Sequence, residues 1–160
     1  MTNKKHAFLM LIFSLCVFLT GCEKETPNSR WSMLKKVDPE PVVIYTESDE
    51  AGQKELVQGI KEETNTISSI YDVAVVKGKK DTLVAYKVKQ MARFKMKSIE
   101  KELTEKLESK YPEEKFTVSS DFKIFLETMR LRDKIQDSEF SEEKADKRLK
   151  EIIKLNNELT

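Results

Sequence analysis

Hydrophobic residues recur every three or four positions in four stretches of this 160-residue chain, which is the spacing of amphipathic helices. The first helix is predicted to begin near Ser48 or Asp49, since both residues are good N-caps. The second is predicted over residues 91–111, the third begins after a cap at Asp121, and the last covers residues 141–157. The apolar stripe expected on the second helix consists of Ala92, Met96, Ile99, Leu103 and Leu107.

Alternating apolar and polar residues predict two strands, over residues 71–77 and 82–89, and a third strand over residues 115–119. Residues 78–81 are expected to form the turn of a hairpin, in which Gly78 is able to adopt a positive φ. The residues expected to share one apolar face are Tyr71, Val73 and Val75 in the first strand and Val84, Tyr86 and Val88 in the second.

These elements give the order helix, strand, strand, helix, strand, helix, followed by a C-terminal helix. Such an order predicts an α+β fold, in which a small three-stranded sheet is covered by helices packed on one face. The step from the strand at 82–89 through the long helix to the strand at 115–119 favours a right-handed crossover and parallel pairing. The β-rich run at 42–45 is a further candidate to pair with the edge of the sheet.

The N-terminus has the pattern of a secretory signal peptide, because Lys4 and Lys5 precede an uncharged apolar run over residues 7–19. As a helix this run rises about 20 Å, well short of the roughly 30 Å of a bilayer core. The residues that follow, Leu19, Thr20, Gly21 and Cys22, resemble the lipobox of bacterial lipoproteins, in which the cysteine is lipidated and becomes the mature N-terminus. We therefore expect a lipid anchor on Cys22; the alternatives are an uncleaved anchor or a plain secretory signal with an incidental cysteine.

The composition divides the chain into four predicted parts. Residues 1–21 are the lipoprotein signal peptide, and residues 22–47 are the lipidated cysteine with a polar, proline-interrupted tether. Residues 48–136 form the α+β domain, and residues 137–160 a C-terminal helical extension. The apolar stripe of that extension either packs back on the sheet or binds a partner helix, and we favour packing because small domains need all the apolar burial available.

Cleavage before Cys22 removes several reactive side chains. The loss of Lys4 and Lys5 takes 29 basic residues to 27, against 28 acidic ones, and the loss of His6 and Cys16 leaves no imidazole and no free thiol. A zinc centre built from cysteine and histidine, or a nucleophile with a histidine base, is therefore not expected. The few glycines cannot form a phosphate loop. We predict no metal, no cofactor and no catalytic residue.

Paired carboxylates carry the one enzymatic alternative, a weak cell-wall hydrolase of the glycosidase kind. The pairs are Glu62–Glu63, Glu113–Glu114 and Glu142–Glu143. A general acid needs an apolar pocket that raises its pKa, whereas these pairs lie among lysines in polar segments. Solvated helix faces therefore explain them better.

Five basic residues within eleven positions form the sharpest charge feature of the chain, with no acid among them: Lys87, Lys89, Arg93, Lys95 and Lys97. Lys87 and Lys89 are expected to point away from the apolar face of their strand, and Lys79 and Lys80 in the turn could extend the patch. Outside the membrane its partners would be anionic lipid headgroups, teichoic acids or acidic peptide stems, and not nucleic acid. The alternative, which charge runs favour in general, is a solvated rim.

Lipobox, polar tether and compact domain together resemble the YhcN/YlaJ-type sporulation lipoproteins. The segments that carry the resemblance are Tyr-Asp-Val-Ala-Val-Val at 71–76, Val-Ala-Tyr-Lys-Val at 84–88 and Thr-Val-Ser-Ser-Asp-Phe at 117–122. The resemblance covers about residues 53–135; the segment 137–160 and the spacing of the hairpin turn depart from the family pattern.

The lipobox predicts a palmitate-type lipid anchor on the extracytoplasmic face of the cell membrane, and the resemblance implies the forespore or spore membrane as its place. The resemblance also implies a part in spore formation, germination or outgrowth and offers no catalytic residues to carry over. Because the mature chain has no histidine, free thiol or glycine loop, we predict a non-enzymatic binding or assembly role. The general shape also resembles membrane-proximal modules that self-associate into rings or bind envelope partners. The alternative function is that of a cell-wall-binding accessory protein or a weak carboxylate-based wall hydrolase.

Overall fold

The computed structural model describes residues 35–45, 49–137 and 139–159. The predictions for the signal peptide, for Cys22 and for the first part of the tether therefore lie outside the described residues. The elements, in chain order, are β1 (Val42–Val43), α2 (Glu50–Asn65), β2 (Ile70–Lys77), β3 (Asp81–Val88), the 3₁₀ helix η2 (Gln90–Lys95), α3 (Met96–Lys110), β4 (Lys115–Ser119), α4 (Phe122–Ile135) and α5 (Glu142–Leu159).

The four strands form one mixed sheet in the order β1-β2-β3-β4. The hairpin β2–β3 is antiparallel, with Val75 opposite Val84, whereas β1 pairs with β2 and β4 with β3 in parallel. The predicted α+β class and the parallel pairing of β3 with β4 are confirmed. The predicted three strands and element order are wrong, because β1 precedes the first helix and adds a fourth strand at the sheet edge, as the β-rich run at 42–45 had suggested.

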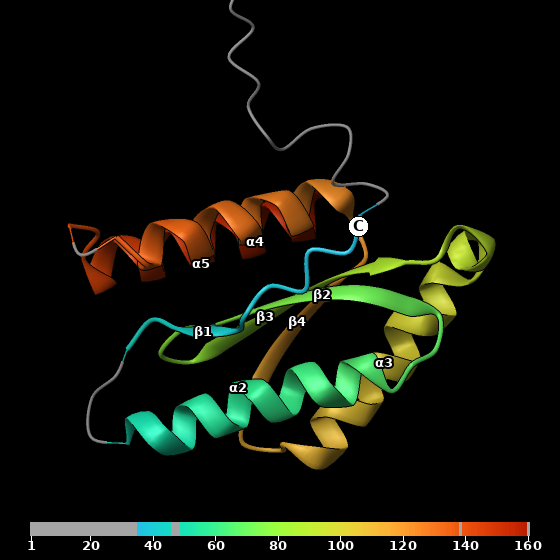
Figure 1. The fold of residues 1–160 in the computed structure, drawn as a ribbon, viewed down its shortest axis with the longest axis horizontal. Helices are drawn as coiled ribbons and strands as arrows, with labels where there is room; N and C mark the ends of the chain where they lie inside the picture. The colour runs from blue at the N-terminus through green and yellow to red at the C-terminus, as the bar shows by residue number, and fades with distance from the viewer. Residues whose placement is uncertain (1–34, 46–48, 138, 160) are drawn as a thin grey trace, which may run out of the picture. The chain divides into compact units, whose positions relative to one another are not determined.

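Helices cover both faces of the sheet, with α4 and α5 above it and α2 and α3 below it in Figure 1. Prediction placed them all on one face, which is wrong because β2 and β3 are apolar on both sides. Val73, Val75, Val84 and Tyr86 belong to the core cluster shared with α2 and α3. The residues between them, Ala74, Val76, Leu83 and Ala85, belong to the cluster shared with α4 and α5.

Helix caps lie where the sequence predicted them. The Asp49 carboxylate accepts a hydrogen bond from the Gly52 backbone N–H at the start of α2, and Asp121 accepts from the backbone of Lys123 and Ile124 at the start of α4. The second predicted helix is divided, since residues 90–95 form η2 and α3 begins only at Met96.

The C-terminal helix α5 packs on the domain, as the burial argument favoured. Ala145, Leu149 and Ile152 are each 1% exposed or less and belong to the core cluster above the sheet. Close approach of α5 to the hairpin turn also explains Gly78, which does not adopt the positive φ expected for it. A Cβ at this position would lie 2.6 Å from the Leu149 Cδ2 atom.

Residues 35–45 cross the edge of the sheet as a strap. The backbone N–H groups of Val37 and Asp38 donate to the Asp72 carboxylate, at 2.9 and 3.0 Å, and Ile44 is 3% exposed. This part of the predicted tether 22–47 therefore belongs to the folded domain, because a buried carboxylate holds its backbone. Among the helices that the structure describes, none is long and apolar enough to cross a membrane.

Candidate binding surface

Lys87 is buried and so does not belong to the basic surface that was predicted for it. Its side chain is 5% exposed, and its ammonium group lies 2.8 Å from the carboxylate of Asp72, which is itself fully buried. It also donates to the Lys35 carbonyl oxygen at 3.1 Å. The prediction failed because it assigned this face of β3 to solvent, whereas α4 covers it: the Phe125 ring centroid lies 4.7 Å from the Lys87 Nζ atom.

An irregularity in β2 brings a second aromatic ring to the same ammonium group. The register of β2 against β3 shifts between Ile70 and Asp72. As a result Ile70, rather than the predicted Tyr71, shares the cluster with Val73 and Val75. The Tyr71 ring centroid lies 5.1 Å from the Lys87 Nζ atom. Lys87 is thus enclosed by a carboxylate and two rings, and its role is structural.

The other four predicted patch residues are exposed and lie together on η2 and its flanks: Lys89, Arg93, Lys95 and Lys97. Within the described ranges none of these side chains forms an ion pair, and no acidic residue occurs between Asp81 and Glu100 in the sequence. The backbone N–H of Lys89 donates to the Ser69 carbonyl oxygen at 2.8 Å, which fixes the start of η2 against the domain. Four of the five predicted residues are therefore exposed on one short segment, and their binding of an anionic partner stays a prediction.

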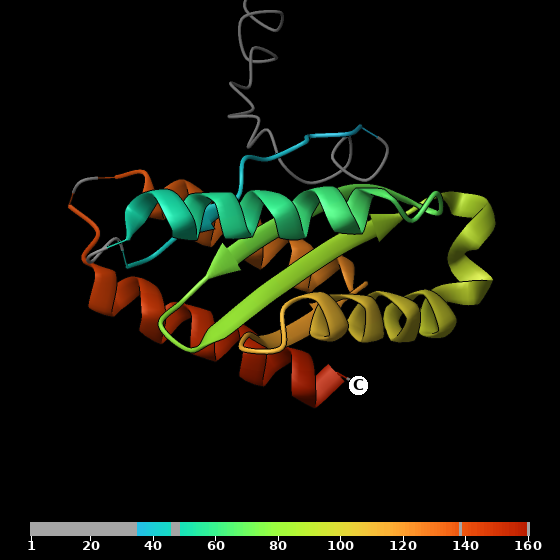
Figure 2. The ribbon, with the colours of Figure 1, turned by 90° about the horizontal axis from the view of Figure 1, so that it is seen from below.

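The predicted extension of the patch to Lys79 and Lys80 is wrong. These residues lie in the hairpin turn, whereas η2 follows the opposite end of β3, and Figure 2 shows the turn and η2 at opposite ends of the sheet. Eight residues of strand separate the two groups, which is a distance of roughly 25 Å. Lys79 instead lies over the Tyr45 ring, with 5.8 Å from its Nζ atom to the ring centroid.

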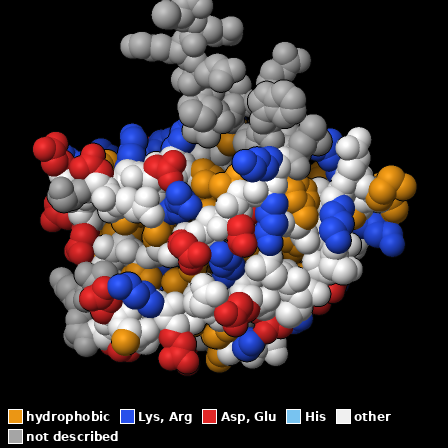
Figure 3. Space-filling view, viewed as in Figure 1, with side chains coloured by type: hydrophobic (Ala, Val, Ile, Leu, Met, Phe, Trp, Pro, Cys, Tyr) orange, Lys and Arg blue, Asp and Glu red, His pale blue; other side chains and the backbone are white. Residues whose placement is uncertain are grey.

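Two large apolar side chains project from the same corner as the four cations. Met91 is 83% exposed and Phe94 79%, more than Leu159 at 50% or Val37 at 44%. Figure 3 shows hydrophobic side chains projecting beside Lys and Arg side chains at the right-hand edge, where Figure 1 places the segment between β3 and α3. We call this group the η2 corner: Lys89, Met91, Arg93, Phe94, Lys95 and Lys97.

The apolar half of the η2 corner was not predicted, because residues 91–111 were expected to form one helix. In that helix Ala92 and Met96 begin the buried stripe, but in the structure burial on α3 begins only at Ile99. The available signal was the spacing of Met91 and Phe94, which lie three residues apart and outside the predicted stripe.

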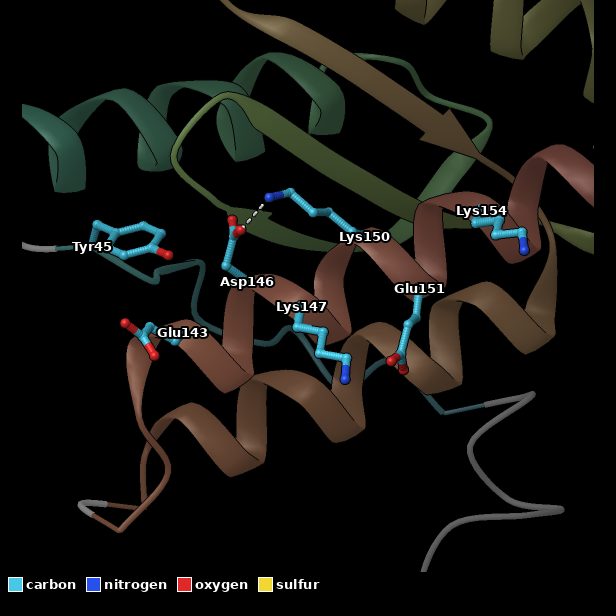
Figure 4. Close-up of a pocket in the computed structure, with 7 residues that line it drawn as sticks. All are labelled: Tyr45, Glu143, Asp146, Lys147, Lys150, Glu151 and Lys154. Atoms are coloured by element: carbon cyan, nitrogen blue, oxygen red, sulfur yellow. Dashed lines mark ion pairs between the residues drawn. The ribbon is translucent and has the colours of Figure 1, made fainter.

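A shallow groove of about 500 Å³ runs along α5 beside Tyr45 and is the second surface feature of the domain (Figure 4). Its other lining residues are Glu143, Asp146, Lys147, Lys150, Glu151 and Lys154. Asp146 and Lys150 form an ion pair at 2.6 Å, and this hydrogen bond raises the pKa of Lys150. Acidic and basic side chains are mixed along the groove, so it selects neither anions nor cations.

Two carboxylates from the predicted acidic pairs, Glu63 and Glu114, form ion pairs with lysines. Glu63 pairs with Lys106 at 2.8 Å and with Lys110, and the hydrogen bonds from these two lysines hold the pKa of Glu63 below its usual value. Glu114 accepts from Lys77 at 2.5 Å and from the Thr82 hydroxyl at 2.9 Å. A general acid requires the opposite pKa shift from that of Glu63. Over the described ranges no three His, Cys, Asp or Glu side chains gather as they would around a metal ion.

Comparison with known proteins adds no relative from which a function could be transferred. No protein-family model matches the chain, and no match is found among curated proteins or solved structures. The resemblance to the YhcN/YlaJ-type lipoproteins accordingly stays a prediction that rests on the residues quoted for it.

Proposed function

We propose that this protein is a lipid-anchored extracytoplasmic protein with a non-enzymatic binding or assembly role in spore formation, germination or outgrowth. The observation that carries the binding role is the η2 corner, where Lys89, Arg93, Lys95 and Lys97 lie exposed and form no ion pair with any acidic residue that the structure describes. A surface of one charge sign favours association with an anionic partner. The sporulation role rests on the family resemblance alone.

The anchor rests on the sequence Leu19 to Cys22 and on simple energetics. Each buried CH₂ group contributes about 0.8 kcal/mol, so that one acyl chain holds a protein weakly, whereas the diacylglyceryl group of a lipoprotein cysteine holds it stably. Lys35, the first described residue, follows Cys22 by thirteen positions. An extended chain of that length reaches at most about 45 Å, which would keep the domain near the membrane surface.

The test is fractionation of host cells that carry either the natural chain or Cys22→Ala, sampled during growth and during sporulation. We expect the natural chain in the membrane fraction, with a lipid-modified N-terminal peptide in mass spectrometry, and only in sporulating cells. Soluble or uncleaved natural protein would contradict the anchor. A lipidated protein present equally during growth would keep the anchor and contradict the sporulation role.

Binding to an anionic cell-wall polymer is the second candidate, because the same four cations would also attract teichoic acids. Reversal of charge at Lys89, Arg93 and Lys97 is expected to abolish retention on purified cell wall if this candidate holds. Retention that is unchanged by the three substitutions would end it. No observation on the described carboxylates favours the weak wall hydrolase, since Glu63 and Glu114 are engaged by lysines.

A further inference from the structure

Met91 and Phe94 are the two most exposed large hydrophobic side chains among the described residues. Of the residues in η2, Ala92 packs against the core cluster below the sheet, while Met91 and Phe94 extend away from it. Large apolar side chains left in water lose the free energy that burial would supply. Their exposure on η2 therefore points to burial against something outside this domain.

The surroundings of these two side chains are uniformly positive. The Lys95 Nζ atom lies 5.6 Å from the centroid of the Phe94 ring, and Lys89, Arg93 and Lys97 are exposed on the same short segment. Apolar side chains next to cations that form no ion pair among the described residues match the order of groups at a bilayer surface, where acyl chains lie beneath anionic phosphates.

Backbone hydrogen bonds and buried side chains hold the backbone of the corner in place, so little backbone conformational entropy is lost when it binds. The Lys89 N–H donates to the Ser69 carbonyl, and the Ala92 N–H donates to the Lys89 carbonyl, both at 2.8 Å. Directly after η2, helix α3 is fixed to the core by Ile99 and Leu103, which are 4% and 0% exposed. A preorganised surface of this kind binds with a lower ordering cost than a flexible one.

The start of the described chain lies at the same end of the sheet as the η2 corner. The Lys35 carbonyl accepts from Lys87, and β3 continues from Lys87 through Val88 to Lys89 and η2. A chain anchored at Cys22 would thus enter the domain at the η2 end and not at the hairpin turn. Contact of the η2 corner with the anchoring bilayer is compatible with this connection.

We propose that the η2 corner is a second membrane contact, in which Met91 and Phe94 insert into the interface of an anionic bilayer while the four cations bind lipid phosphates. The inference rests on the proposed function in so far as the domain must lie beside a membrane. A second copy of the chain would have to offer a surface that is both apolar and acidic, and the α5 groove, where charges of both signs are mixed, is not such a surface. An anionic polymer would engage the cations but would leave Met91 and Phe94 in water.

Fluorescence of a tryptophan at the tip tests insertion without the lipid anchor. The chain used is residues 22–160 with Cys22→Ser, which keeps the whole of the compact unit formed by residues 34–160. Phe94→Trp is combined with Trp31→Phe, so that the only tryptophan reports on the corner. Vesicles of phosphatidylglycerol with phosphatidylcholine are expected to shift its emission to the blue, and brominated acyl chains to quench it. Unshifted and unquenched emission would overturn the proposal.

Substitutions distinguish insertion of Met91 and Phe94 into the bilayer from electrostatic attraction of the four cations to lipid phosphates. Met91→Ser with Phe94→Ser is expected to weaken vesicle binding at least about tenfold, since burial of one such side chain is worth roughly that factor. The variant Lys89→Glu, Arg93→Glu, Lys97→Glu is expected to lose binding. The control variant Lys123→Glu, Lys144→Glu, Lys147→Glu makes the same change of net charge at exposed positions elsewhere and is expected to retain binding.

Circular dichroism first establishes that the variants are folded. Each remaining outcome then supports or contradicts the proposal. Unchanged vesicle binding by the double serine variant would contradict insertion. A dimer in analytical ultracentrifugation that the serine substitutions abolish, with vesicle binding intact, would assign the corner to a second copy. Because the chain tested carries no anchor, failure of this proposal and failure of Cys22 lipidation are observed separately.

Discussion

At the scale of single residues, Asp72 and Lys87 show that a charged side chain can serve the fold instead of a binding surface when it is buried. Simple alternation would assign both residues to a solvent-facing side of their strands, yet both are buried beneath α4 and the strap. Asp72 accepts from Val37, Asp38 and Lys87, so that its carboxylate is satisfied by three donors. No local pattern in β3 distinguishes Lys87 from the exposed Lys89; only the packing of α4 does.

Removal of one member of this buried pair should be costly. Asp72→Asn leaves the Lys87 ammonium group buried without a counter-charge, and we expect the free energy of unfolding in urea to fall by about 3 kcal/mol or more. The control Asp133→Asn breaks an exposed pair with Arg132 and should cost less than about 0.5 kcal/mol. A loss at Asp72 as small as that of the control would show that the pair does not hold the strap.

The lowered pKa of Glu63 predicts the direction in which the stability of the domain changes with pH. Hydrogen bonds from Lys106 and Lys110 lower its pKa below the ordinary 4.5. A depressed pKa in the folded state contributes stability that is fully present above pH 4.5 and is lost as the pH falls through the folded pKa. We therefore expect the thermal midpoints of the natural chain and of Glu63→Gln to differ at pH 7 and to converge in acid. A constant difference across this range would contradict the assignment.

At the scale of elements, sequence patterns correctly predicted the features that depend on residues close together in the chain. The hairpin, the caps at Asp49 and Asp121, and β4 are local features and lie where they were expected. The division of residues 91–111 into η2 and α3 was missed, because the apolar spacing of Ala92 and Met96 continues that of the helix, whereas the first buried residue is Ile99.

The contact between α5 and the hairpin turn can be tested by a double-mutant cycle. Leu149→Ala removes a fully buried side chain and should destabilise the domain by about 2–5 kcal/mol, whereas Leu159→Ala, half exposed, should have little effect. Gly78→Ala places a Cβ against Leu149 and should cost about 1–3 kcal/mol. The double variant Gly78→Ala, Leu149→Ala should cost less than the two single losses together, because the contacting methyl group is gone. Strict additivity would contradict the contact.

At the scale of the whole molecule, the sequence predicted the α+β class but not its layers. A sheet with one covered face requires alternation, and β2 and β3 instead carry apolar residues on both faces, a signal that favours helices on both sides. The strand β1 has only two residues, too few for any periodicity to reveal. For the candidate surface, the sequence predicted the four exposed cations. It did not predict the exposure of Met91 and Phe94, because that depends on the direction in which η2 leaves the sheet.

The central claim is that this domain is held at a membrane through Cys22 and acts there by binding. The most direct test is the intact mass of the protein purified from the membrane fraction of its host. We predict a chain that begins at Cys22, lacks residues 1–21 and carries the added mass of a diacylglyceryl group with a further acyl chain or a free amino group. A chain that still begins at Met1, or that begins at Cys22 without added lipid mass, would contradict the account.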